Sequence, residues 1–266
     1  MFLGEWCKNY LKQDKWSILN YKILEYHWDN RKKYHNDYVE LEILYEKYIK
    51  ILTRSLNDIH NQNNSTRYWR IVIGPWLRYF IEILFDRYSL IINANSTYKI
   101  QNTHILKYNL EEWIPIDYQQ FHRYNLLDSW NHVLFSEIIK FLNNFNYEII
   151  DIELKPIKRK HSKRNLKNIA RSFIIFYSKL ISKYEEIFFV NSLMRIRDLL
   201  SIQISLNQFP NIFDILINPI KVKRKKICSK KRNQFKISAG NSDFEKLLNY
   251  LIPKFIPIAH LESYNQ

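Results

Sequence analysis

The sequence predicts an α/β fold, a helix-rich layered structure with a mostly parallel sheet. Short segments with the apolar character of strands alternate with long segments whose apolar residues recur every three or four positions, which is typical of α/β proteins. Apolar residues make up 46% of the 266 residues and aromatic residues 16%, which is enough for a packed interior. We expect a single α/β lobe over residues 1–266.

Glycine is scarce in this chain, with three residues against the usual share of about 7%. Walker loops and GxGxxG fingerprints need glycines where the backbone approaches phosphate, and neither motif is present. Cys7 and Cys228 lie far apart and match no metal-binding or redox spacing. We therefore expect no cofactor and no metal ion in this chain.

Two strands are expected near the amino terminus, at residues 1–4 and 21–26. Glu5 would follow the first strand, and ligands of open α/β sheets gather at the carboxyl ends of the strands. Glu5 is therefore a site candidate. The alternative is that Glu5 caps the next helix.

A long amphipathic helix is expected from residue 29 onward, with Asp29 or Asn30 as its N-cap. A polar turn at residues 60–65 follows, in which Asn64 or Ser65 caps the next helix.

Two histidines lie at the edges of these segments. His27 is close to Asp29 in the sequence and His60 is close to Arg67, so both are candidates for acid–base chemistry. The alternative for each histidine is a structural role.

The densest apolar stretch, RYWRIVIGPWLRYFIEILFDRY, occupies residues 67–88. Its Gly-Pro pair predicts a short helix ending near Ile73 and a long helix starting at Pro75, because proline lacks an N–H and clashes with the preceding turn. A helix that is apolar around most of its circumference is normally a core helix. The alternative is that its polar stripe faces a cleft that holds an anion, with these residues at the stripe or its entry: Arg67, Arg70, Arg78, Glu82 and Asp86.

The remaining elements follow the same two periods. The helical pattern is expected to break at residues 93–97. Further strands are expected at residues 104–108, 147–152, 187–190 and 256–261, and Pro253 and Pro257 flank the start of the last one. Further helices are expected at residues 117–142, 172–184, from 191 toward 208, and after a cap formed by Ser242 with Glu245 or by Asp243.

Arg195 and Arg197 would lie just after a strand, at the amino end of a helix. Helix amino ends bind anions readily, so both arginines are anion-site candidates. The alternative is that they pair with Asp198 or face solvent.

The net charge of +15 is concentrated in two basic loops, at about residues 155–168 and 221–236. The excess is explained by a solvated surface of a lysine-rich sequence, or by attraction to an anionic membrane. Binding to nucleic acid is less favoured, because the clusters lack the glycine and aromatic residues of an RNA-binding sheet. Without a signal peptide or an apolar run of about twenty residues, we expect a cytoplasmic protein, with peripheral attachment to the inner face of the plasma membrane as a variant of this expectation.

Four stretches together resemble a known family: LGEWC at residues 3–7, YHWDNRKK at 26–33, LNDIHNQNNSTRYWR at 56–70 with the GPWL that follows, and the closing segment 242–264. They are similar to a bacterial family of transferases found among O-antigen and other surface-carbohydrate biosynthesis genes. The middle of the chain, about residues 96–236, matches loosely. Family members are longer, and their second half, which this chain lacks, resembles nucleotide-sugar and polyol-phosphate transferases.

The resemblance implies one lobe of a two-lobed, GT-B-like transferase of surface polysaccharide. This chain would be the amino-terminal, acceptor-side half of a longer protein. A nucleotide-activated sugar or polyol donor would be held by the other half, and the acceptor would be a glycan or a lipid-linked molecule. The acceptor-side candidates are Glu5, His27, His60, Arg67, Arg70 and Arg78, and no catalytic residue is identified. The alternatives are a non-catalytic module that binds a membrane surface or acts as a scaffold and, less favoured, a nucleic-acid-binding protein.

Overall fold

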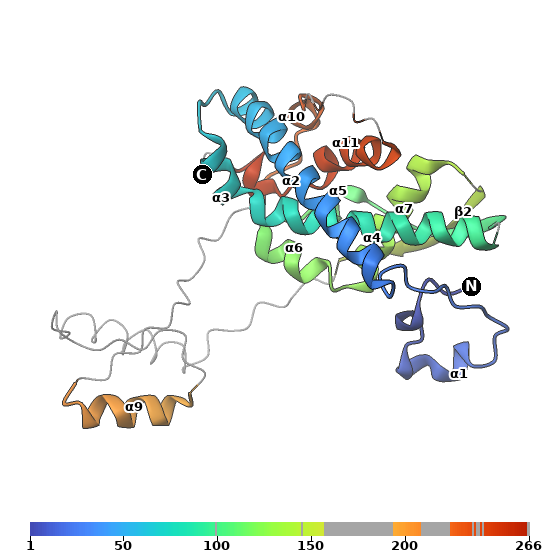
Figure 1. Ribbon diagram of the computed structural model, residues 1–266, viewed down its shortest axis with the longest axis horizontal. Coiled ribbons are helices and arrows are strands. Elements are labelled where there is room, and N and C mark those ends of the chain that lie inside the picture. The colour runs from blue at the N-terminus through green and yellow to red at the C-terminus, as the bar shows by residue number, and fades with distance from the viewer. Residues whose placement is uncertain are drawn as a thin grey trace. The chain divides into compact units, whose positions relative to one another are not determined.

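The computed structural model describes residues 1–98, 100–144, 146–156, 194–208, 224–235, 237, 240 and 242–264 (Figure 1). The chain divides into two compact units, the first formed by residues 1–156 with 222–266 and the second by residues 157–221. The first unit is a helix-rich α/β structure with a parallel sheet, as predicted. Of the second unit the described part is residues 194–208, which contain helix α9 (Ile196–Ser205).

The first unit is built on two long helices. Helix α2 (Arg31–His60) begins after Asn30, whose side chain accepts a hydrogen bond from the Lys33 amide at 3.0 Å. Helix α3 (Thr66–Val72) begins after Ser65, whose hydroxyl accepts from the Tyr68 amide at 3.2 Å. Between the alternative caps, the structure therefore selects Asn30 and Ser65.

Helix α4 (Gly74–Tyr98) follows α3 directly, so the predicted division of the central stretch at Gly-Pro is confirmed. The predicted break at residues 93–97 is wrong, because α4 continues through them. Ala94 is buried in a small cluster with Leu24 and Leu90. This packing holds the last turns of α4 in a helix although the local residues are poor helix formers.

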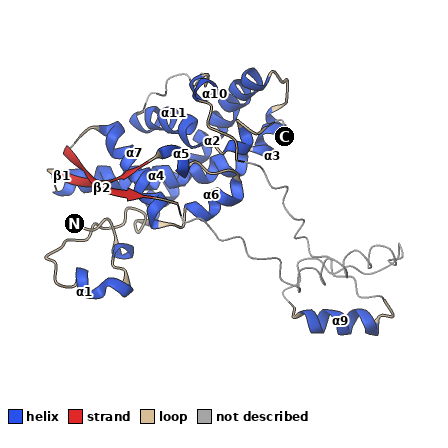
Figure 2. Cartoon of the chain, turned by 180° about the vertical axis from the view of Figure 1, so that it is seen from behind, coloured by secondary structure: helices blue, strands red, loops and turns tan. Residues whose placement is uncertain are grey.

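The described sheet has two parallel strands, β1 (Asn102–Tyr108) and β2 (Asn146–Leu154) (Figure 2). Ile105 lies opposite Ile149, and the register shifts between Leu106 and Lys107. Both strands confirm sequence predictions. Parallel neighbours need a long crossover, which here consists of α5 (Leu110–Trp113), α6 (Tyr118–Tyr124) and α7 (Asp128–Leu142).

The crossover differs from the single helix predicted at residues 117–142, because that segment is divided into α6 and α7. Leu127 is in an extended conformation between them. The side-chain amide of Asn131 donates to the carbonyl oxygens of Asn125 and Leu127 at 2.8 and 3.0 Å. The Leu127 carbonyl also accepts the Asn131 backbone amide at 3.0 Å, whereas the Asn125 carbonyl, at the end of α6, is satisfied by the Asn131 side chain.

The amino-terminal segment contains the short helices η1 (Glu5–Cys7), η2 (Tyr10–Lys12) and α1 (Gln13–Trp16). The two strands predicted at residues 1–4 and 21–26 are wrong in extent, because their pairing is reduced to one parallel bridge between Phe2 and Ile23. The chain turns into η1 immediately after Gly4, whose carbonyl accepts from the Cys7 amide at 3.1 Å. This turn ends the extended segment after a few residues.

The carboxyl-terminal segment contains α10 (Ser229–Asn233), α11 (Asp243–Phe255) and η3 (Ile258–His260). The cap of α11 is a capping box between Ser242 and Glu245, one of the two predicted alternatives. The strand predicted at residues 256–261 is wrong: this segment forms η3, while Pro253 lies inside α11. The Ile258 and Ala259 amides donate instead to the loop carbonyls of residues 115 and 116 at 3.0 and 2.7 Å.

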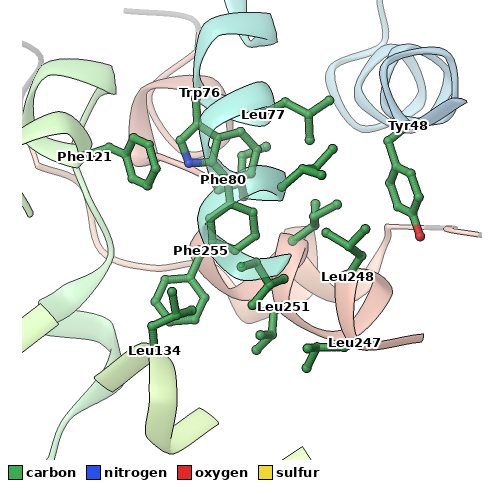
Figure 3. Close-up of a cluster of buried hydrophobic side chains, with 14 of the residues drawn as sticks. Tyr48, Trp76, Leu77, Phe80, Phe121, Leu134, Leu247, Leu248, Leu251 and Phe255 are labelled. Atoms are coloured by element: carbon green, nitrogen blue, oxygen red, sulfur yellow. The ribbon is translucent and has the colours of Figure 1, made fainter. Parts of the chain in front are cut away.

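The core surrounds α4, which confirms its prediction as a buried central helix (Figure 3). Side chains from α2, α6, α7 and α11 pack against those of α4. The residues labelled in the figure are Trp76, Leu77 and Phe80 of α4, with Tyr48, Phe121, Leu134, Leu247, Leu248, Leu251 and Phe255 of the other helices. Within the described ranges, none of the helices combines the length and apolar character needed to cross a bilayer.

Some predicted segments lie outside the described residues. They are the helix at 172–184, the strand at 187–190, the first basic loop from residue 157 onward, and residues 221–223 and 236 of the second basic loop. Residues 229–233 of the second basic loop form α10. Arg232 is buried there and forms an ion pair with Glu262, so this one basic residue does not face solvent.

Candidate active site

A buried carboxylate lies in the middle of the apolar helix α4. The Asp86 side chain is 5% exposed, and a buried charge is costly unless it is paired. Its Oδ1 atom is 2.9 Å from Nε2 of His27, whose side chain is 1% exposed. His27 belongs to the loop between the Phe2–Ile23 bridge and α2, so two distant segments meet at this pair.

The pair fixes which nitrogen of His27 carries the proton. An ionised carboxylate can only accept hydrogen bonds, so Nε2–H of His27 donates to Asp86. In the neutral imidazole the other ring nitrogen, Nδ1, carries the lone pair, and this atom is buried without a hydrogen-bond partner among the described residues. An unpartnered ring nitrogen on an imidazole oriented by a carboxylate is an arrangement that general-base catalysis uses.

The second oxygen of Asp86 is held by a guanidinium. Arg87 forms an ion pair with Oδ2 of Asp86, and its Nε donates to the side-chain oxygen of Asn131 at 3.1 Å. Asn131 is itself fixed by its bonds at the junction of α6 and α7. Helices α4 and α7 thus hold the carboxylate in one orientation toward His27.

Aromatic rings surround His27 and limit the access of water. The ring centroids of Tyr26 and Trp28 lie 5.1 and 4.7 Å from that of His27, and Phe85 lies at 6.4 Å. Burial, and then the charge of Asp86, raise the pKa of the Tyr26 hydroxyl. Tyr26 is therefore a neutral phenol at physiological pH. Charge interactions are stronger in such a partly dry site than in water.

The loop that carries His27 is fastened to the first turns of α2. The Trp28 indole N–H donates to Oδ2 of Asp37 at 2.9 Å, and Lys33 pairs with the same carboxylate. Asp29, the sequence neighbour predicted to act with His27, is exposed, and the partner of His27 is Asp86 instead. The sequence signal for Asp86 was its position as an acidic residue in the middle of an apolar run.

Glu5 lies on η1, next to the aromatic wall of this site. Its exposed carboxylate pairs with Lys8, and the neighbouring Trp6 contacts Tyr26 edge to face at 5.6 Å. The Trp6 ring folds back over Gly4, where a Cβ atom would lie 2.2 Å from it. A side chain at position 4 would therefore displace Trp6 from Tyr26.

Arg70 and Arg78 form bidentate ion pairs across the contact of α2 with α3 and α4. Arg70 binds Glu46 and Arg78 binds Glu42, each with a second bond of 2.8 Å. Both guanidinium groups lie over the ring of Tyr45, at 5.6 and 4.8 Å. Carboxylates of the protein thus occupy the forks in which these arginines would bind an anion.

His60 has its own set of partners. Its Nε2 lies 3.1 Å from the His260 carbonyl oxygen, and its ring stacks on Tyr264 with centroids 4.1 Å apart. Burial lowers the pKa of His60. Arg67 is exposed at the start of α3. The contact partners of His60 are different residues from those of His27.

Arg195 and Arg197 lie at the start of α9, in the second unit. Arg195 is the N-cap residue, Arg197 is in the first turn, and both are exposed. The strand predicted before them lies outside the described residues. Throughout the described part of the chain, no three histidine, cysteine or acidic side chains gather as a metal site would require.

The fold and the site define a helix-rich α/β protein with a buried histidine–aspartate centre. A family model described as LIC12162 family transferase matches residues 1–266, and the chain belongs to that family. This match confirms the transferase class inferred from the sequence. No curated protein and no solved structure matches the chain.

Proposed function

We propose that the protein is a transferase of surface-polysaccharide or O-antigen biosynthesis that moves a glycosyl or polyol-phosphate group. The donor is a nucleotide-activated sugar or polyol, and the acceptor is a hydroxyl of a glycan or a lipid-linked molecule. The observation that carries the proposal is the free Nδ1 of His27, oriented by Asp86, in a chain that a transferase family matches along its length. In this proposal the chain is the acceptor-side lobe of a GT-B-like enzyme at the inner face of the plasma membrane.

The proposed step needs a base on the acceptor side. The acceptor oxygen forms a bond to the anomeric carbon or the phosphorus of the donor, and its proton passes to Nδ1 of His27. The bond that joins this anomeric carbon or phosphorus to the leaving nucleotide breaks, and the nucleotide keeps the electron pair. The carboxylate of Asp86 stabilises the imidazolium that forms.

Transfer assays on the complete protein encoded by the locus would test the role of His27. With a panel of nucleotide-activated sugars and polyols, we expect His27→Gln to lower kcat by roughly 10²- to 10⁴-fold, the usual contribution of a general base. The matched control is His35→Gln, because His35 is exposed on α2. Equal activity of wild type and His27→Gln would contradict the catalytic role. Absence of transfer by the wild type with every donor would favour the binding or scaffold alternative.

A further inference from the structure

The amino-terminal loop, defined as residues 5–22, exposes large apolar side chains. Tyr10 is 82% exposed, Leu11 88% and Ile18 82%, and Trp6 and Leu19 are more than half exposed. Such side chains are scattered singly on most soluble proteins, whereas here they are gathered in one short segment. A cluster of this kind indicates a surface that contacts another apolar phase or partner.

The loop is ordered by its own hydrogen bonds and ring contacts. The Trp16 indole N–H donates to the Asn9 carbonyl at 2.8 Å, and the Asn9 side chain accepts from the Leu11 amide at 2.9 Å. Tyr21 packs against Phe2 and Trp16, with centroids at 4.8 and 6.2 Å. These contacts hold the loop in a conformation in which Tyr10, Leu11 and Ile18 are exposed.

Lysines alternate with the exposed apolar side chains. The loop has four lysines against Glu5 and Asp14, which leaves a net charge of +2. Lys12 and Lys15 are exposed, and with Trp16 and Leu19 they line a pocket of about 180 Å³. Lysine and aromatic side chains beside apolar ones suit the boundary between lipid headgroups and acyl chains, where ammonium groups meet phosphates.

We propose that the amino-terminal loop docks on an anionic membrane surface. Leu11, Ile18 and Leu19 enter the headgroup region, and Lys12 and Lys15 face lipid phosphates. This site is separate from the basic loops from which membrane attraction was expected. Trp6 joins the loop to Tyr26 beside His27, so docking would hold the candidate active site at the surface that carries lipid-linked acceptors. Only this last consequence rests on the proposed function.

Vesicle flotation tests the docking without donor or acceptor. We expect the wild type to float with vesicles containing anionic phospholipid and to bind purely zwitterionic vesicles weakly. Leu11→Asp with Ile18→Asp should reduce binding by about tenfold or more, because charged side chains resist entry into the interface. The matched control is Ile43→Asp with Ile71→Asp, since these side chains are 67% and 70% exposed on α2 and α3.

The lysines are tested separately. Lys12→Gln with Lys15→Gln should weaken the preference for anionic vesicles and its dependence on salt. Circular dichroism establishes that each variant is folded. The proposal is overturned if the wild type does not bind, or if the loop and control variants bind equally well. It is also overturned if sedimentation shows a dimer that the loop variant dissociates, because the loop would then contact a second copy of the chain. Since no transfer is measured, failure of docking and failure of the catalytic proposal are distinguishable.

Discussion

At the scale of single residues, Asp86 shows what keeps a carboxylate inside an apolar helix. One oxygen faces His27 and the other faces Arg87, and both partners are held by further contacts. Removing one member of a buried charged group leaves the others uncompensated. We expect Asp86→Ala to lower the free energy of unfolding by about 3 kcal/mol, measured by urea denaturation at pH 7.

The control for this prediction is Asp58→Ala, because Asp58 is exposed on the long helix α2. It should change stability by less than about 0.5 kcal/mol. Equal small effects of the two substitutions would mean that the pair at His27 does not contribute to stability.

Because the protein contains buried histidines, we expect its free energy of unfolding to decrease in mild acid. Burial lowers the pKa of His260 to about 4 and also lowers the pKa of His60 and His132, whereas an unfolded histidine titrates near 6.5. Above pH 6.5 these groups are neutral in both states. As the pH falls below 6.5, the unfolded state binds protons that the folded state cannot bind, so the free energy of unfolding decreases until His260 itself protonates near pH 4.

We expect the denaturant midpoint to decrease as the pH is lowered from 7 to 4.5. In this range carboxylates with a lowered pKa, such as Glu137, stay ionised. Burial opposes the lowered pKa of Glu137, but hydrogen bonds from Lys254 and Tyr108 outweigh it. His260→Gln should reduce the slope of the free energy of unfolding against pH by up to about 1.4 kcal/mol per pH unit. His122→Gln should leave this slope unchanged, because His122 is exposed. An unchanged slope in His260→Gln would contradict the account.

At the scale of elements, the capping box of α11 was predictable because its signal is local. The Ser242 hydroxyl accepts a hydrogen bond from the Glu245 amide at 3.1 Å, and the Glu245 carboxylate accepts one from the Ser242 amide at 3.5 Å. We expect Ser242→Ala to destabilise the protein by about 1 kcal/mol, measured as a shift of the thermal midpoint. Ser229→Ala is the comparison, since Ser229 is the first residue of α10, after an N-cap residue, Cys228, that makes no side-chain cap bond. A shift as small as that of Ser229→Ala would show that the cap is dispensable.

The caps and the break at Gly74-Pro75 depend on a few adjacent residues, whereas the failures of prediction depended on distant ones. Residues 93–97 look like a loop, yet Ala94 packs against Leu24 and keeps them helical. Residues 256–261 look like a strand, yet their amides bond to the loop at residues 115 and 116. Local sequence cannot show which of these tertiary contacts will form.

At the scale of the whole molecule, the same limit governs the site. The sequence could nominate His27 from its loop position and Asp86 from its apolar surroundings. It could not pair them, because 59 positions separate them and their meeting depends on the packing of α4 against the amino-terminal segment. Nor could it show that Glu42 and Glu46 already bind Arg78 and Arg70.

The first unit is formed by two separate parts of the chain, residues 1–156 and 222–266. The second part completes the core, since Leu247, Leu251 and Phe255 of α11 are fully buried in it. We therefore expect a protein in which about twelve Gly/Ser residues, spanning roughly 20 Å, replace residues 157–221 to unfold cooperatively with the core intact. Circular dichroism and urea denaturation measure this, and a non-cooperative transition would show that the first unit depends on the second.

The same variant separates the amino-terminal loop from the first basic loop as a source of membrane attraction. It lacks most of the basic loop at residues 155–168 but keeps most of the second basic loop and the amino-terminal loop with Leu11 and Ile18. If the amino-terminal loop docks the protein, the shortened chain should still float with anionic vesicles, and Leu11→Asp with Ile18→Asp should weaken this binding as strongly as in the full chain. If flotation is instead lost on excision, the removed residues carry the attraction, and the ordered apolar cluster of the amino-terminal loop must have another partner.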